Sequence, residues 1–372
     1  MLHFYRLSAA AMALTVALTA CTEGTGGTGL NDEPFAPAAS AADLQVVQGA
    51  FAASVFEAFA LSSRNFSLVP DSGAVPVALR QTRLEAASAG SHWEAEAAAR
   101  SFAAAGPAAG PLVPLDFLGR TYDRRIDGYR HNPERTDAPA NRVRFILYEI
   151  DPVTHEPGDT EIGYVDLLDE STELAYVARV VVVTAGIVRI NYTVSAVVGT
   201  QSLGFTVSGF IGDGTDQIDV DLSMTFVHDF PISIATVEHL FSVPSRDFEV
   251  DAAVVFEFNE ETLQGSVDIH ATFMQGAHTV TVTGVIAFTE GDLLTEGGSF
   301  EIHVDGQLFV TISVDGDNII VQNAAGGELT SVEAQHVETM FHGLEEMFDD
   351  KFEDCIRPVA WLFEANGSTG AF

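Results

Sequence analysis

The chain has 372 residues, of which 47% are hydrophobic and 26 are Phe, so it is long enough to bury a large core in one or two domains. Its 53 acidic residues against 17 Lys and Arg give a formal net charge of −36. Most of this charge lies in residues 146–372, a part that is expected to repel nucleic acid and anionic lipid surfaces and to favour cationic or protein partners.

The first 20 residues are typical of a signal peptide. Arg6 supplies a positive charge, and residues 7–17 form an apolar stretch that is too short to span a bilayer. The run Leu18-Thr19-Ala20-Cys21 follows. It resembles the lipobox of bacterial lipoproteins, in which Leu and two small residues precede the cysteine.

The resemblance covers residues 1–21 only, and every position of the motif fits. It implies that the Cys21 sulfur receives a diacylglyceryl group, that residues 1–20 are removed, and that the new amino terminus is acylated. Each buried methylene contributes about 0.8 kcal/mol, so two or three acyl chains would hold the protein in a membrane. The alternative is an ordinary secretory signal with an incidental cysteine.

The residue after Cys21 bears on the destination. In the sorting rule of enteric lipoproteins, Asp at this position retains the protein at the inner membrane, whereas this chain has Thr22. The sequence therefore predicts a lipid-anchored protein of the cell envelope, at the outer membrane, with Cys21 as the lipidation site. Lipidation of Cys21 would leave Cys355 without a disulfide partner, and Cys355 is expected to be a buried small apolar residue.

Residues 21–39 are rich in Gly and Pro and are expected to form a flexible tether. An amphipathic helix is predicted over residues 41–61, because apolar residues recur there at spacings of three and four: Leu44, Val47, Phe51, Val55 and Phe59. Residues 77–104 have a helical composition, and the Pro- and Gly-rich residues 106–141 are expected to be irregular. Residues 40–141 are therefore predicted to be a helical and irregular N-terminal region.

A basic cluster lies late in this region. It consists of Arg120, Arg124, Arg125, Arg130, Arg135, Arg142 and Arg144, and it is interleaved with Asp123, Asp127, Glu134 and Asp137. The interleaving favours pairing of these arginines with the protein's own carboxylates, and the alternative is contact with lipid phosphates near the anchor. The rest of the chain is strongly acidic, since residues 146–372 carry 39 acidic and 5 basic residues.

Apolar and polar residues alternate along residues 142–322, which predicts successive strands with one buried face. Ile218, Val220 and Leu222, for example, alternate with Asp219 and Asp221. Asp-Gly pairs such as those at 305–306 and 315–316 favour hairpin turns, so neighbouring strands are expected to be antiparallel. Residues 177–183 are apolar on both sides and are predicted to be a central strand covered on both faces.

The period becomes helical after residue 329. Residues 330–333 have the pattern of a capping box, and a dense apolar stripe predicts a helix over about residues 330–352. This helix is expected to pack into the core, with a lipid-facing or partner-binding role as the alternative. The predicted fold class is α+β and predominantly β: a large curved antiparallel β-meander, over residues 142–372, with N-terminal and C-terminal amphipathic helices packed on its apolar face.

No catalytic, cofactor or metal site is predicted. The nucleophile elbow Gly-x-Ser-x-Gly and the zinc motif His-Glu-x-x-His are absent. Glu338, His342 and Glu346 have ligand-like helical spacing but lack further partners, and His270 and His303 fall on polar strand faces. Calcium binding is the alternative for four aspartates, but the spacing of Asp219 and Asp221 along one strand favours a solvated face: Asp213, Asp216, Asp219 and Asp221.

Three functional classes remain compatible with the sequence. The first is a non-catalytic envelope lipoprotein, anchored in the membrane through Cys21, with a structural or partner-binding role. The second is a periplasmic carrier of a lipid or other hydrophobic ligand between sheet and helices. The third is an enzyme whose site has no recognisable motif.

Overall fold

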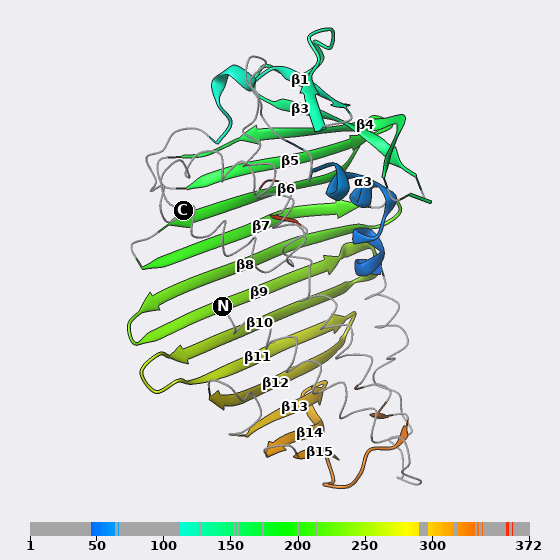
Figure 1. The fold of residues 1–372 in the computed structure, drawn as a ribbon. Helices are drawn as coiled ribbons and strands as arrows, with labels where there is room; N and C mark the ends of the chain where they lie inside the picture. Colours follow the sequence, from blue (N-terminus) through cyan, green and yellow to red (C-terminus); the bar gives the residue numbers. More distant parts are fainter. Residues whose placement is uncertain are drawn as a thin grey trace. The chain divides into compact units, whose positions relative to one another are not determined.

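The computed structural model describes residues 46–63, 66, 112–125, 128–151, 153–154, 156–172, 175–198, 201–212, 214–289, 297–315, 318–331, 333–334, 337, 355–356 and 359. Fifteen strands dominate these residues, in an open and mostly antiparallel sheet order (Figure 1). The prediction of a mainly β, antiparallel protein is therefore confirmed. The chain divides into two compact units, each with its own core: unit 1 is residues 1–48 with 218–349, and unit 2 is residues 49–217 with 350–372.

Unit 2 contains the first strands of the chain. They are β1 (Arg120–Arg125), β2 (Gly128–His131), β3 (Val143–Ile150), β4 (Pro157–Asp169), β5 (Tyr176–Thr184), β6 (Ile187–Val198) and β7 (Ser202–Gly212). From β3 to β7 each strand pairs antiparallel with the next. β1 pairs antiparallel with β2 but parallel with β3, as in the pair Arg120↔Val143, so the sheet is not a pure meander.

The expectation of irregular structure before residue 142 is therefore wrong for residues 120–125 and 128–131. β1 has the sequence Arg-Thr-Tyr-Asp-Arg-Arg, which contains no alternation of apolar and polar residues. It is nevertheless a strand because Tyr122 and Asp123 are buried and find partners within unit 2. Charged side chains with buried partners give no signal in a hydrophobic pattern.

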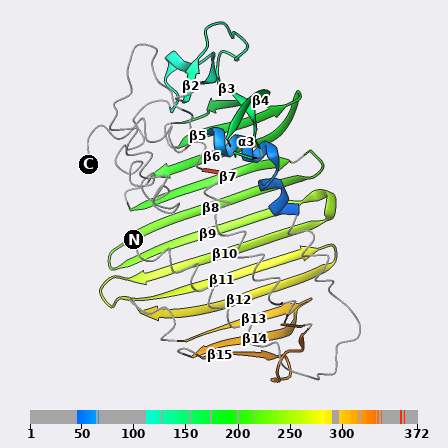
Figure 2. The same ribbon diagram turned by 45° about the vertical axis from the view of Figure 1, so that its right-hand side comes forward.

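Helix α3 (Ser54–Ser63) lies against β3 and β4 of unit 2 (Figures 1 and 2). Residues 46–51 are also helical, and a turn at residues 52–53 separates the two pieces. The break shifts the helical phase, so Phe56 is buried after it while Val55 is half-buried. The predicted single helix over residues 41–61 is thus interrupted within its described part.

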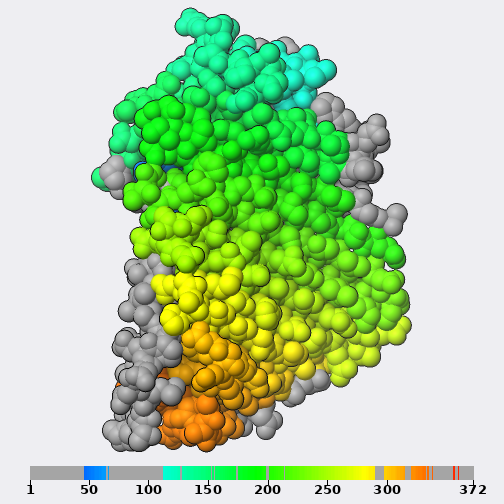
Figure 3. All heavy atoms as spheres, turned by 180° about the vertical axis from the view of Figure 1, so that it is seen from behind, coloured from blue at the N-terminus to red at the C-terminus, as the bar shows by residue number. Residues whose placement is uncertain are grey.

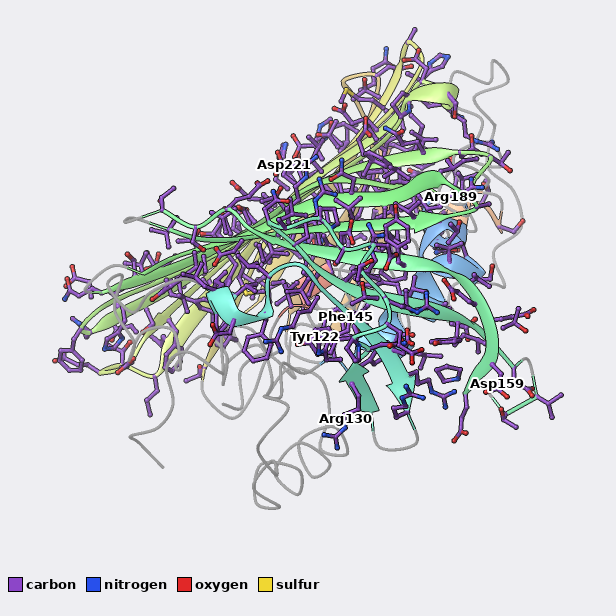
Figure 4. All side chains as sticks on the ribbon, turned by 90° about the horizontal axis from the view of Figure 1, so that it is seen from above. Tyr122, Arg130, Phe145, Asp159, Arg189 and Asp221 are labelled. Atoms are coloured by element: carbon purple, nitrogen blue, oxygen red, sulfur yellow. The ribbon has the colours of Figure 1, made fainter. Side chains whose placement is uncertain are left out.

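Aromatic rings fill the core of unit 2 between α3 and the sheet. The Phe66 ring stacks on the Phe145 ring at 4.1 Å, and Phe145 in turn lies 5.2 Å from Tyr122. Figure 4 shows Tyr122 and Phe145 side by side, whereas Arg130 points away from them. Farther along, the Tyr192 hydroxyl donates a 2.8 Å hydrogen bond to the Cys355 carbonyl oxygen. Cys355 is a free, buried cysteine, as predicted.

Unit 1 contains the remaining strands: β8 (Gln217–Asp229), β9 (Ile232–Val243), β10 (Phe248–Asn259), β11 (Gln264–Gln275), β12 (His278–Thr289), β13 (Gly298–Val304), β14 (Gln307–Asp315) and β15 (Asn318–Asn323). Each pairs antiparallel with the next. One register line shows the order: Leu222 pairs with His239 and His239 with Ala252.

The predicted alternation is confirmed in unit 1. Ile218, Val220 and Leu222 are at most 2% exposed, whereas Asp219 and Asp221 lie on the opposite face of β8. The turn at Asp305-Gly306 has positive φ at both residues, 50° and 77°, as the Asp-Gly sequence predicted. By contrast, β5 is fully buried on one face and half-buried on the other over Val177, Arg179 and Val181, so it is covered less completely than expected.

The capping box at the start of the predicted C-terminal helix is confirmed. The Thr330 N–H donates to Glu333 Oε2 at 2.7 Å, and the Glu333 N–H donates to Thr330 Oγ1 at 3.2 Å. Ala334 and Val337 are helical and buried. Residues 338–352 lie outside the described part of the chain, so the rest of the predicted helix stays a prediction.

Candidate functional site

The basic cluster predicted from the sequence forms a network with carboxylates of unit 2. Arg144 on β3 points at Asp166 on β4, with Nε 2.7 Å from Oδ1 and Nη2 2.9 Å from Oδ2. The Arg144 Nη1 also donates to Asp137 at 3.0 Å, and its guanidinium carbon lies 3.6 Å from the centre of the Tyr164 ring. Arg142 contacts the same Asp166 carboxylate at 3.2 Å.

Arg135 forms a second node of this network. Its Nε lies 3.0 Å from Asp123, and its Nη2 lies 2.7 Å from Glu161. The Asn132 amide donates to Asp123 at 2.6 Å, so this buried carboxylate is held from two sides. Arg124 donates to the backbone carbonyl oxygens of Pro157 and Gly158 and so fixes the start of β4 to β1.

The electrostatics of the network favour permanently charged groups. Burial opposes the charge of Arg144, but its hydrogen bonds and charge contacts with Asp166 and Asp137 outweigh burial and raise the pKa of Arg144. The hydrogen bond with Glu161 raises the pKa of Arg135. Burial acts against ionisation of Asp137, yet the contacts with Arg144 bring its pKa below the ordinary value. Groups of this kind stay ionised near neutral pH and do not exchange protons, which suits a structural role better than acid–base catalysis.

This network supports the first reading of the basic cluster. Arg124, Arg135, Arg142 and Arg144 all contact acidic residues or carbonyl groups of the same unit. The acidic partners of these arginines could not be predicted from the sequence, because Asp166 and Glu161 lie on β4, far outside the basic stretch. No spacing rule connects them to the arginines.

The outer face of unit 1 is acidic. Asp221, Glu238, Asp251, Glu257, Asp268 and Glu301 are exposed on strands β8 to β13. The strands β8 to β15 contain no Lys or Arg. Figure 4 shows Asp221 standing out from the sheet surface. The electrostatic potential over such a face is negative.

The aspartate group considered for calcium is not gathered by the structure into a site. Asp219 and Asp221 lie in register with Ser242 and Leu240 on one solvated face, and Asp213 lies outside the described residues. Within the described ranges, no group of three or more His, Cys, Asp or Glu side chains has a geometry that could hold a metal ion. Glu338, His342 and Glu346 fall outside those ranges, as does Cys21.

Histidines of unit 1 fall into two environments. His278 pairs with Asp305 at 3.0 Å, and His303 lies 3.7 Å from Glu301 on the outer face. His239 was not singled out in the sequence, although it occupies an inward position of β9 and is 1% exposed. Burial lowers the pKa of His239 to about 3, so it is neutral at physiological pH. Its place in the alternation between Val237 and Phe241 could have identified it as a core histidine.

Comparison with known proteins gives no relative for this chain. No protein-family model, no curated protein and no solved structure matches it. Among the described helices, none is both long enough and apolar enough to cross a membrane.

Proposed function

We propose that the protein is a non-catalytic lipoprotein of the bacterial cell envelope, held in the outer membrane through lipidated Cys21. The observation that carries the proposal is the run Leu18-Thr19-Ala20-Cys21 behind a short apolar segment. The network around Arg144 supports the non-catalytic part, because its charges bind one another.

The folded units would then be displayed at a short distance from the membrane by residues 21–39. The acidic outer face of unit 1 suits a cationic or basic protein partner, and it disfavours contact with anionic phospholipid. In this proposal the helices predicted over residues 41–61 and 330–352 pack on the apolar faces of the sheets. The contact of α3 with β3 and β4 and the burial of Val337 are consistent with that packing.

Acyl labelling tests the anchor. The full chain expressed in a bacterium that processes lipoproteins is expected to incorporate labelled palmitate and to fractionate with membranes. Cys21→Ser should lose the label and leave the membrane fraction, and Cys355→Ser is the matched control that should keep both. Mass spectrometry of the mature amino-terminal peptide would identify the lipid. Membrane retention of Cys21→Ser would overturn the proposal.

The carrier alternative has its own readout. Organic extraction of purified Cys21→Ser protein, followed by lipid mass spectrometry, measures ligand that is not covalently attached. The proposed structural or partner-binding role predicts no stoichiometric lipid in that extract. One lipid per protein chain would establish the carrier instead.

A further inference from the structure

The sheet of unit 1 ends in an edge strand that carries no charge. β15 pairs with β14, and no strand lies beyond it in the described part of the chain (Figures 1 and 2). Its sequence is Asn-Ile-Ile-Val-Gln-Asn, without Lys, Pro or any acidic residue. Natural edge strands commonly carry charges or Pro that discourage pairing with other chains. β15 has none of these features, in a protein with 53 acidic residues.

The hydrogen-bond pattern shows which backbone groups face the open edge. The Ala324 N–H donates to the Phe309 carbonyl oxygen on β14 at 3.0 Å. Backbone groups of successive residues in an antiparallel strand point alternately to the partner strand and away from it. Counting back from Ala324, Ile320 therefore faces β14, while Ile319 and Val321 present their N–H and C=O groups to the edge.

The edge is closed after Val321 by a local turn. The Asn323 N–H donates to the Gly327 carbonyl oxygen at 2.9 Å, and the Asn323 carbonyl accepts from the Gly326 N–H at 2.8 Å. The Asn323 side chain also accepts the N–H groups of Ala325 and Gly327. An added strand therefore has Ile319 and Val321 to pair with, and not Asn323.

We propose that β15 pairs with β15 of a second copy of this chain, antiparallel, about a twofold axis through Ile320. In this register Ile319 of one copy and Val321 of the other exchange N–H···O=C bonds, and the symmetric pair does the same. Ile320 then lies opposite Ile320 of the second copy, in the close pairing of residues that share no backbone bonds. Interfaces of this symmetry use the same patch on both subunits.

The strand matches its own reverse in this register. Reading outward from Ile320 in either direction gives a β-branched residue and then an amide, since Ile319 and Asn318 mirror Val321 and Gln322. A register centred on Val321 would instead place Ile319 opposite Asn323, whose backbone groups are bonded within the turn. The self-complementary sequence and the turn that binds the backbone groups of Asn323 therefore both favour a twofold axis through Ile320.

A row of paired residues on the outer face, with an exposed apolar residue at each end, leads to the proposed axis. Ile320 is 50% exposed, and the row that continues from it through Ser313 and Ser299 reaches Val285, which is 46% exposed. Atoms of the orange strands near this end lie at the surface in Figure 3. Pairing would place the Ile320 side chain directly opposite Ile320 of the second copy and bury the two against each other.

Charge sets the conditions of the association. Each copy carries −36, so two copies repel one another, but the strand that pairs is neutral. Salt screens this repulsion, since the Debye length is roughly 10 Å at 0.1 M ionic strength and shortens as salt is added. The dimer is therefore expected to strengthen as ionic strength rises, opposite to an association held by ion pairs.

Cysteine crosslinking tests the register in the full chain carrying Cys21→Ser and Cys355→Ser. Ile320→Cys should form a disulfide-linked dimer at least about tenfold faster than Gln322→Cys, because residues in the close pairing have Cα atoms ~4.5 Å apart. Gln322→Cys and Val321→Cys are matched controls. In this register the cysteine of Gln322→Cys would lie opposite Asn318 of the second copy and that of Val321→Cys opposite Ile319, so neither cysteine meets another cysteine. Faster crosslinking of Val321→Cys than of Ile320→Cys, or equal slow crosslinking of all three, would overturn the proposal.

Light scattering tests the association without a crosslink. The Cys21→Ser chain should show a concentration-dependent mass that approaches twice the monomer and increases with salt. Ile320→Lys should remain monomeric although it lowers the net negative charge, whereas Val285→Lys, on the same row but on central strand β12, should still dimerise. Equal dimerisation of both Lys variants, or a monomer at all salt concentrations, contradicts pairing through β15.

Discussion

Arg144 and Asp166 occupy directly paired positions of β3 and β4 and make two hydrogen bonds, at 2.7 and 2.9 Å, while both side chains are almost fully buried. A buried ion pair is costly to form, but removal of one partner leaves a charge without compensation. Loss of one partner of this pair is therefore expected to cost more than the intact pair adds to net stability.

Asp166→Asn is expected to destabilise unit 2 by about 3–5 kcal/mol, because Arg144 would keep its charge without a buried carboxylate. Replacing both residues together, Arg144→Met with Asp166→Leu, should recover much of that loss. Urea unfolding followed by circular dichroism measures the difference. Glu161→Gln is the control, since its pair with Arg135 is partly exposed and should contribute no more than about 1 kcal/mol. Equal effects of Asp166→Asn and Glu161→Gln would show that burial of the pair is unimportant.

Acid should destabilise unit 1 through His239. Its pKa of about 3 in the folded protein lies below the unfolded value of about 6.5, so the unfolded state binds the proton first. Titration of His239 does not affect the free energy of unfolding above about pH 6.5. This free energy decreases as the pH falls toward 3, by up to about 5 kcal/mol in total. His239→Phe should reduce the pH dependence of unfolding in this window by about one proton. The same slope in the variant and the parent would contradict this assignment.

Gly284→Ala should destabilise unit 1 by about 1–3 kcal/mol, because a Cβ at this position would overlap the ring of Phe300 on β13. Gly284 and Phe300 are paired residues, and the buried Phe300 ring covers the glycine. Gly306→Asn is the control, since a Cβ there meets no atom within 4 Å and Asn accepts the positive φ of the turn. Thermal unfolding of both variants decides the matter, and an unchanged midpoint for Gly284→Ala would be inconsistent with the overlap.

Thr330→Ala should cost about 1 kcal/mol by removing the acceptor for the Glu333 N–H. Ser331→Ala, on the exposed neighbouring residue, should change stability much less. Hydrogen exchange of the Ala334 amide gives a local readout, because this N–H donates to the Thr330 carbonyl oxygen. Unaltered protection of that amide in Thr330→Ala would argue against the cap.

The strands of unit 1 could be predicted because each has one buried and one solvated face. Ile218 to Asp221 illustrates this, since burial follows the alternation residue by residue. β1 could not be predicted in this way, because its inward positions include Asp123 and its stability depends on partners distant in sequence. The turn within the N-terminal helix was also missed, since the apolar spacing of Val47 and Phe51 continues to Val55 without a visible break.

Tests of the anchor and of dimerisation are independent. Cys21→Ser removes the proposed lipidation site and leaves β15 intact, whereas Ile320→Lys alters β15 and leaves residues 1–21 intact. Failure of the lipoprotein proposal would therefore show in acyl labelling, and failure of strand pairing would show in solution mass. Neither result determines the other.

The hydrogen bond from Tyr192 to Cys355 joins residues separated by 163 positions. Unit 2 is thus assembled from two stretches of chain, with residues 218–349 inserted between them. Cys355, Ile356 and Val359 supply buried side chains to that assembly and follow residues 218–349 in the chain. During translation, strands β1 to β7 therefore wait for a segment that is made only after residues 218–349 of unit 1. A factor that shields exposed strands in that interval would be needed more by unit 2 than by unit 1.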